Sequence, residues 1–310
     1  MSMRIAVIGA GNMGCLYGAN LARAGAEVVL VDSWEEHIEQ MQVHGLAMDG
    51  LHGEFVVAVE ATTHAEAVAP VDLAIILVNA YDTPAAAATA AELLSPDGCA
   101  LTLQNGLGNI EVLQEALGAE RVLAGLSFHS ADLRGPGAVG HTNKGPTYLG
   151  EWNGASTARL AQVASWMERA DMEPVVEADI EATIWGKFVH NCAINALCAV
   201  TDLRPGHIRD IEELDQFQSR IIEETLALVQ ARNIAIPSAD PMGEIKAYCA
   251  SKFHRVSMLQ HLARGRRTEI DALNGYVVRE SRKLGLACPY SESLTALVQG
   301  LQYKPVSAEC

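Results

Sequence analysis

Three polar side chains stand four residues apart in an otherwise apolar stretch. Lys187, Asn191 and Asn195 occupy positions i, i+4 and i+8 among residues such as Phe188 and Ile194. At 3.6 residues per turn, this spacing keeps all three within about 80° on one helix face. Because burying an unpaired polar group is costly, the pattern favours a face that meets a ligand. A stripe facing solvent or a buried structural network is the alternative.

A glycine-rich sequence, GAGNMG, follows an apolar run near the N-terminus and opens a helical pattern. Such a turn sets a helix N-terminus against the pyrophosphate of a dinucleotide. The first glycine makes the tight turn, the second admits the phosphates, and the third lets the helix pack on the strand. A tight turn without a ligand is the alternative. The cofactor-binding residues predicted here are Gly9, Gly11, Asn12, Met13 and Gly14.

An acidic residue ends the next β-branched run. Asp32 lies 18 residues after Gly14, where the adenosine ribose of a dinucleotide is expected. A carboxylate there accepts hydrogen bonds from the ribose hydroxyls and repels a 2′-phosphate. No Arg or Lys follows closely, so the sequence predicts NAD(H) rather than NADP(H). The alternative is that Asp32 or Ser33 caps the following helix.

Two further motifs have ordinary structural explanations when each is taken alone. QNGLGN follows a strand-like run, so Asn105 is expected at the sheet edge where doubly wound folds bind ligands. Asn-Gly is nevertheless a very common turn. Glu269, in the sequence RRTEID, is expected in the first turn of a helix, where an acid complements the helix dipole.

The pattern of elements changes along the chain. Strand-like runs alternate with helical patterns up to about residue 120, which predicts βαβ units and a parallel sheet. Residues 121–151 carry short apolar runs broken by GPG and KGP, and we expect antiparallel strands added to that sheet. After a short strand at 174–176, helical patterns follow at 180–200, 211–232, 242–252, 267–284 and 291–301. The predicted fold class is α/β, a doubly wound sheet (1–177) followed by an all-helical domain (178–310).

Composition narrows the class of ligand. The 310 residues carry 22 Lys and Arg against 38 Asp and Glu, a formal net charge of −16. This acidic balance argues against nucleic-acid and anionic-membrane partners but not against a small anionic substrate. Seven Cys without a CxxC pair predict reduced thiols in a cytoplasmic protein and no metal site. No run reaches the roughly 18 apolar residues of a membrane span.

In this order, the motifs resemble those of the ketopantoate reductase (2-dehydropantoate 2-reductase) family. The resemblance rests on GxGxxG, QNGLGN, W-x-K-x3-N-x3-N, and S-M-L-Q ahead of R-x-T-E-I-D-A-L-N-G, and it covers almost the whole chain. It implies a Rossmann-type dinucleotide-binding domain, then a helical domain for substrate binding and dimerisation. A homodimer is compatible with it.

The resemblance also implies roles for individual residues. Lys187 matches the catalytic lysine of the family, and Glu269 matches its catalytic glutamate. Asn105 matches an asparagine on the nicotinamide side of the site. The positions that match residues binding the substrate are Asn105, Asn191, Asn195 and Ser257.

Three positions depart from the common pattern of the family. Asp32 and Asn79 stand at cofactor-binding positions where many members carry a basic residue, and His261 replaces the usual acid after S-M-L-Q. The first two departures remove positive charge from around the cofactor, which again favours NAD(H). The V-D-x-W-x-x-H-I stretch is closer to the NAD-using D-2-hydroxyacid (D-mandelate type) dehydrogenases of the same family.

The function implied is hydride transfer from a nicotinamide cofactor to a branched 2-oxo acid, with 2-dehydropantoate reduced to (R)-pantoate as the leading reaction. Lys187 would protonate the forming alkoxide, and Glu269 would orient the lysine or hold the product hydroxyl. The alternative is an NAD-dependent D-2-hydroxyacid dehydrogenase for bulky branched or aromatic 2-oxo acids. A dinucleotide sensor would not need Lys187 and Glu269, and a 3-hydroxyacid dehydrogenase does not account for R-x-T-E-I-D.

Overall fold

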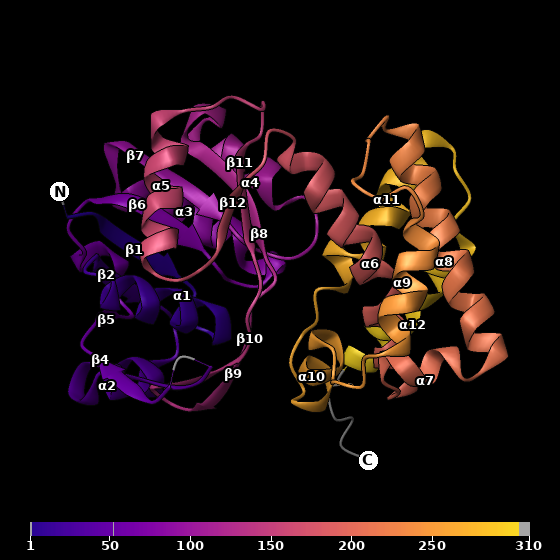
Figure 1. Ribbon diagram of the computed structural model, residues 1–310, viewed down its shortest axis with the longest axis horizontal. Helices are drawn as coiled ribbons and strands as arrows, with labels where there is room; N and C mark the ends of the chain where they lie inside the picture. Colours follow the sequence, from indigo (N-terminus) through magenta and orange to yellow (C-terminus); the bar gives the residue numbers. More distant parts are fainter. Residues whose placement is uncertain (1, 52, 304–310) are drawn as a thin grey trace, which may run out of the picture. The chain divides into compact units, whose positions relative to one another are not determined.

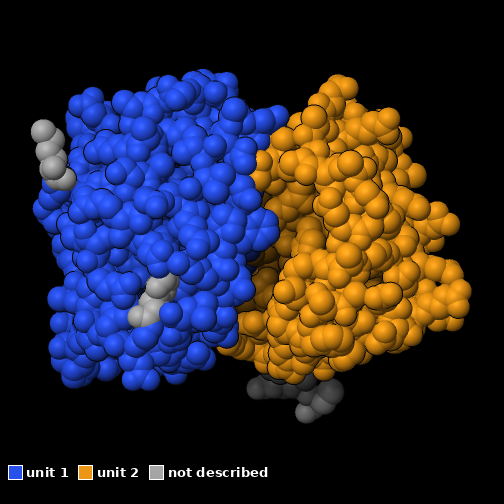
Figure 2. Space-filling model, in the orientation of Figure 1, with its two compact units in different colours: residues 1–105, 109–181 blue, residues 106–108, 182–310 orange. Residues whose placement is uncertain are grey.

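The computed structural model describes residues 2–51 and 53–303, which form two compact units. Unit 1 comprises residues 1–105 and 109–181, and unit 2 comprises residues 106–108 and 182–310 (Figure 2). The short segment 106–108 therefore packs with the helices that follow much later in the sequence.

Unit 1 is built on an eight-stranded sheet, labelled in Figure 1. All neighbouring strands are parallel except one antiparallel pair, β8 and β11. The central strands are continuous apolar runs, as expected for parallel strands that are buried on both faces. Across the sheet, the order is β12 (Pro174–Val176), β11 (Thr147–Glu151), β8 (Val122–Ser127), β7 (Leu94–Thr102), β6 (Val71–Ile76), β1 (Arg4–Ile8), β2 (Glu27–Val31) and β5 (Glu60–Thr62).

The two faces of this sheet are covered by different helices. Ile5 and Val7 of β1 belong to one apolar cluster, which includes α1 and α5. Ala6 and Ile8 belong to a second cluster, which includes α3 and α4. This alternation along one strand confirms the predicted doubly wound architecture. The helices of unit 1 are α1 (Asn12–Arg23), α2 (Glu35–His44), α3 (Thr83–Leu93), α4 (Asn109–Leu117) and α5 (Ala158–Arg169), with 3-10 turns η1 (Ala65–Ala67), η2 (Ala80–Asp82) and η3 (Ala119–Arg121).

A second, four-stranded sheet corrects one expectation. Its order is β4 (Phe55–Val57), β3 (Leu46–Gly50), β10 (Ala138–Asn143) and β9 (Ser130–Gly135). The prediction that residues 121–151 all extend the main sheet is wrong, because only β8 and β11 do so. β9 and β10 instead form an antiparallel pair, and β10 also pairs with β3 in parallel.

Unit 2 contains helices around a long apolar one, α6. Two buried amide side chains bond to the α6 backbone: Gln218 donates to the Ala193 carbonyl at 3.2 Å, and Asn274 donates to the Cys192 carbonyl at 3.1 Å. No helix in the described part of the chain is both long and apolar enough to cross a membrane. The helices are α6 (Ile180–Thr201), α7 (Pro205–Arg209), α8 (Glu212–Ala231), α9 (Pro241–Ala250), α10 (Ser257–Ala263), α11 (Asn274–Leu284) and α12 (Pro289–Gln302), with the 3-10 turn η4 (Ile270–Ala272).

One helix expected over 267–284 is shorter than the sequence pattern suggests. Leu273 adopts φ −109° and ψ −111°, which is not helical, and it separates η4 from α11. Glu269 therefore precedes a 3-10 turn instead of standing in the first turn of α11. The dipole of α11 does not account for this acid.

Candidate active site

Two glycines of the first turn are required by the fold of unit 1 itself. Gly9 has φ +96°, and a Cβ on it would lie 2.7 Å from the backbone nitrogen of Val78. A Cβ on Gly14 would lie 1.8 Å from the Gly9 carbonyl oxygen. Both positions are therefore closed to any side chain by neighbouring backbone.

Gly11 is different, because nothing in the protein excludes a side chain there. Its φ is −72°, and a Cβ built on it meets no atom within 4 Å. It precedes α1, whose first turn has no side-chain cap and no acidic residue. The open side of Gly11 and the uncapped N–H groups at Asn12 and Met13 fit a dinucleotide pyrophosphate.

This difference gives a matched pair of variants. We expect Gly11→Ala to leave the unfolding midpoint almost unchanged but to raise the dissociation constant for NADH about tenfold or more, because the new methyl occupies the approach path of the phosphates. Gly14→Ala should lower the midpoint, because its methyl overlaps backbone. Thermal unfolding and fluorescence titration measure the two effects, and unaltered NADH binding by Gly11→Ala would contradict this placement.

Asp32 stands at the end of β2 and is half-buried. Its Oδ2 accepts from the Ala10 N–H at 2.7 Å, and its Oδ1 accepts from the Trp34 N–H at 3.0 Å. The helix-cap alternative fails for Asp32, because α2 begins after Trp34 and has no side-chain cap. The Asp32 carboxylate thus connects the glycine turn at Ala10 with the segment that follows β2.

The turns after β1, β6 and β7 lie at one edge of the sheet, because these parallel strands are neighbours. Asn79 follows β6, and Gln104 and Asn105 follow β7. Gln104 donates to the Val78 carbonyl and to Thr83 Oγ1, both at 2.9 Å, and so joins the two later turns. The Asn105 carbonyl accepts from the Asn109 side chain at 3.1 Å.

In unit 2, the structure brings the two predicted catalytic residues within electrostatic reach of each other. Lys187 is half-buried on α6. Burial lowers the pKa of Lys187 to about 8, while the charge of Glu269 acts in the opposite direction. A lysine whose pKa lies this close to neutrality can both give and take a proton. Asn191 and Asn195 follow on the same helix, half-buried and buried respectively.

Ser257 and Glu269 line one small hollow in unit 2, together with His261, Met258 and Leu273. Burial lowers the pKa of His261, and the charges of neighbouring arginines lower it further, which favours the neutral ring. The other polar side chains that line the hollow are the hydroxyl of Ser257 and the carboxyl group of Glu269. These are the predicted substrate-binding and catalytic groups of that segment.

His190 is a residue that sequence analysis missed. It lies on α6 between Lys187 and Asn191, and its ring packs edge-on against Tyr248 at 4.4 Å between centroids. Burial and the charge of Lys187 lower the pKa of His190 to about 4, and the Asn191 side chain hydrogen-bonds to it. His190 follows Lys187 by three residues, and residues three apart on a helix are neighbours, so the sequence alone could have placed it beside the lysine.

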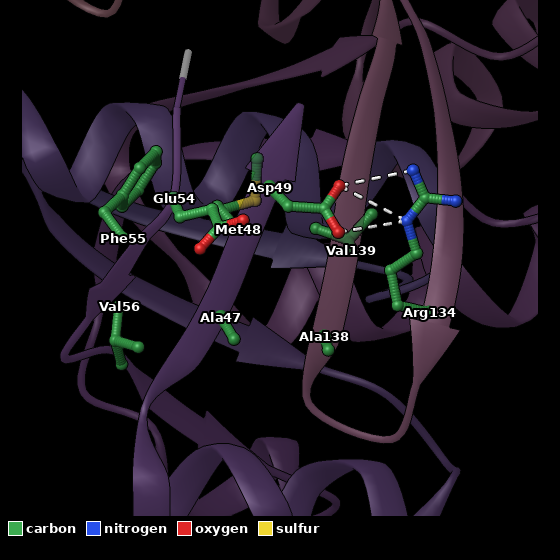
Figure 3. A pocket seen from close by; sticks show the side chains of 9 residues that line it. All are labelled: Ala47, Met48, Asp49, Glu54, Phe55, Val56, Arg134, Ala138 and Val139. Carbon is green, nitrogen blue, oxygen red and sulfur yellow. Dashed lines mark hydrogen bonds and ion pairs between the residues drawn. The ribbon is translucent and has the colours of Figure 1, made fainter. Parts of the chain in front are cut away.

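An open pocket in unit 1 contains none of the predicted site residues. It measures about 410 Å³ and lies over the four-stranded sheet, where Arg134 contacts both carboxylate oxygens of Asp49 (Figure 3). An arginine whose charge is already matched in this way offers little to an anionic substrate. The pocket size alone does not make it the active site.

Comparison with known proteins shows the family to which the chain belongs. Residues 5–154 match the family model described as Ketopantoate reductase PanE/ApbA, and residues 179–302 match the model of its C-terminal part. A 2-dehydropantoate 2-reductase of Halobacterium salinarum is 34% identical over 300 residues, 96% of this chain and 98% of that protein.

Two solved structures are similar over nearly the whole chain. A PanE/ApbA family ketopantoate reductase from Ralstonia eutropha has a TM-score of 0.91 at 32% identity, covering 97% of this chain and 98% of that one. D-Mandelate dehydrogenase in complex with NADH and anilino(oxo)acetate has a TM-score of 0.88 at 27% identity, with the same coverage. By fold, by order of motifs and by sequence, the chain belongs to the ketopantoate reductase family.

Proposed function

We propose that the chain reduces 2-dehydropantoate to (R)-pantoate, using a nicotinamide cofactor. The observation that carries the proposal is that Lys187 of α6 and Glu269 lie close enough for the charge of Glu269 to act on the lysine. A protein that only sensed dinucleotides would have no use for this pair. The relative from Halobacterium salinarum, which is named a 2-dehydropantoate 2-reductase and aligns over the full length, supports this substrate.

The catalytic role of Lys187 follows from where charge appears in such a reduction. A reduced nicotinamide, when bound, would supply the hydride for the new C–H bond at carbon 2 and would itself become oxidised. The ammonium group of Lys187 stabilises the negative charge that develops on the carbonyl oxygen, then donates its proton to make the hydroxyl. Glu269 favours the protonated form of Lys187, against the effect of burial.

We assign substrate binding to polar groups near this pair. Asn191 and Asn195 lie one and two turns beyond Lys187 on α6 and offer amide groups to the hydroxyl and carboxylate of the substrate. Ser257 offers a hydroxyl in the hollow that Glu269 also lines. Asn105 completes this set and is also assigned to the nicotinamide.

We assign the cofactor to the sheet edge of unit 1, held by Gly9, Gly11, Asn12, Met13, Gly14, Asp32, Asn79 and Asn105. NAD(H) is favoured over NADP(H), because a 2′-phosphate would meet Asp32 and the exposed acids Glu35 and Glu36 that begin α2. The NADH bound in D-mandelate dehydrogenase supports this preference. In this assignment, residues 1–177 bind the dinucleotide, and residues 178–310 bind the substrate and pair with a second copy of the chain.

A D-2-hydroxyacid dehydrogenase for bulky branched or aromatic 2-oxo acids is the second candidate, supported by the TM-score of 0.88 with D-mandelate dehydrogenase. A panel of substrates separates the two. We expect kcat/KM to be highest for 2-dehydropantoate and lower for 2-oxo-3,3-dimethylbutanoate, which lacks the 4-hydroxyl, and for phenylglyoxylate. A preference for phenylglyoxylate would favour the second candidate. Each substrate should be assayed with NADH and with NADPH.

The lowered pKa of Lys187 predicts opposite pH profiles for the two directions of the reaction. Reduction needs the ammonium form, so its kcat/KM should be level below about pH 8 and fall above it. Oxidation of the hydroxy acid needs the neutral amine, so its kcat/KM should rise through the same range. Profiles of both directions at subsaturating substrate test this prediction, and a kcat/KM for reduction that increases above pH 8 would contradict it.

A further inference from the structure

A buried histidine joins three separate segments of unit 1. His37 lies on α2, and its side chain is fully buried, at 0% exposure. Its Nε2 is 2.9 Å from the carbonyl oxygen of Ala10, in the glycine turn. Its Nδ1 accepts a hydrogen bond of 2.8 Å from the N–H of Gly137, in the turn between β9 and β10. Neither the hydride transfer nor the substrate contacts proposed above account for this ring.

These contacts determine which ring nitrogen carries the proton. The Gly137 N–H can only donate, so Nδ1 must be unprotonated. In the neutral ring the proton is then on Nε2, which donates to the Ala10 carbonyl. Burial lowers the pKa of His37 and so favours this neutral form. Trp34 stacks on the ring, with 4.7 Å between centroids and 11° between planes, and holds its orientation.

The direction of the Ala10 carbonyl decides the direction of the next N–H. In a trans peptide, the C=O of one residue and the N–H of the next point in opposite directions. Because His37 holds the Ala10 carbonyl toward the interior, the Gly11 N–H points away from the ring. Gly11 is also the residue around which a Cβ finds no neighbouring atom.

Both polar groups of Ala10 are therefore fixed. Asp32 accepts from its N–H at 2.7 Å, and His37 donates to its carbonyl. The Cys15 thiol is a second, weaker donor to the same carbonyl, at 3.1 Å. Asp32 alone would leave the Ala10–Gly11 peptide less constrained, because it holds only the preceding N–H.

We propose that His37 is a positioning residue for the cofactor: through the Ala10 carbonyl, it orients the Gly11 N–H toward the pyrophosphate. The inference rests on the proposed use of a nicotinamide dinucleotide and extends it to a residue that does not touch the cofactor. It assigns separate effects to the two ring nitrogens. Nε2 controls cofactor affinity, whereas Nδ1 anchors the ring to the β9–β10 turn.

Two substitutions separate these effects, because each keeps one half of the ring's hydrogen bonding. The amide nitrogen of His37→Gln reaches the position of Nε2 and keeps the donor to Ala10. The amide oxygen of His37→Asn reaches the position of Nδ1 and keeps the acceptor for Gly137. Each variant loses one buried hydrogen bond, so we expect similar decreases in unfolding midpoint.

Fluorescence titration of the full chain with NADH and with NADPH is the test. For the cofactor that the unaltered chain binds more tightly, His37→Asn should raise the dissociation constant about tenfold, and His37→Gln less than about threefold. Met41→Ala, a buried change one turn along α2, is the control for general destabilisation and should leave affinity unchanged.

Equal losses of affinity in His37→Asn and His37→Gln, or no loss in either, would overturn the role of His37 and leave the proposed function intact. A loss of affinity in Met41→Ala as large as that in His37→Asn would also overturn it, because stability would then explain both. If the unaltered chain binds neither NADH nor NADPH, the proposed function itself is wrong, and this inference with it.

Discussion

Replacing Lys187 with alanine should lower kcat for the reduction of 2-dehydropantoate by about 10²–10⁴-fold, the range expected when a general acid is lost. The side chain supplies both a proton and a positive charge at the oxygen where negative charge develops. None of the residues assigned above to the cofactor is Lys187, so the dissociation constant for NADH should change little. Steady-state rates and fluorescence titration measure these two quantities separately.

Lys283→Ala is the matched control, because it removes a lysine of the same unit whose side chain is 70% exposed and pairs with Glu280. We expect almost full activity from it. Turnover near that of the unaltered enzyme in Lys187→Ala would remove the lysine from the mechanism. An equal decrease of kcat in Lys187→Ala and Lys283→Ala would mean that the rate depends on the total positive charge of unit 2 and not on one proton donor.

Cofactor choice should depend on Asp32. We expect kcat/KM of the unaltered enzyme to be at least about tenfold higher with NADH than with NADPH. The reason is that each close contact between the 2′-phosphate of NADPH and a carboxylate costs on the order of 1 kcal/mol. Asp32→Asn should narrow this ratio, since it removes the charge but keeps one oxygen for the Ala10 or Trp34 N–H. Asp32→Arg should narrow it further or reverse it.

The structure adds a condition to this experiment. Because Asp32 also accepts from the Ala10 N–H, Asp32→Arg should weaken binding of both cofactors, and only the ratio of the two kcat/KM values reports on the 2′-phosphate. Initial rates at subsaturating NADH and NADPH give this ratio. Equal use of both cofactors by the unaltered enzyme would show that Asp32 does not select between them.

The sequence was sufficient for those elements whose pattern is local. The predicted alternation of strands and helices up to about residue 120 matches the order of elements in unit 1, and the helix predicted at 180–200 matches α6 (Ile180–Thr201). β3 was missed because LAMDG is short and its last residues are polar or glycine. Its partner β10 lies about 90 residues later, so no local pattern reveals the second sheet.

Some residues of the candidate site were likewise predictable from local sequence spacing, and others were not. The i, i+4, i+8 spacing from Lys187 to Asn195 follows from helix geometry alone, so it was predictable. The position of Glu269 was not, because the break at Leu273 is a backbone feature within an uninterrupted helical pattern. His37 belongs to the V-D-x-W-x-x-H-I stretch, but its role was not predictable, because it depends on contacts with Ala10 and Gly137 that only the fold creates.

The small segment Gly106–Gly108 has a consequence for how this chain is assembled. Its Leu107 N–H donates to the Ala272 carbonyl at 3.1 Å, and a Cβ on Gly106 would lie 2.6 Å from the same oxygen. The helical unit thus takes part of its interior from the N-terminal half of the sequence. A fragment starting at Ala182 would lack the buried Leu107 side chain and a partner for that carbonyl. During synthesis, Leu107 emerges long before residues 182–310, the part of the chain with which it packs. The two units are therefore not independent modules that gene fusion or truncation could exchange freely.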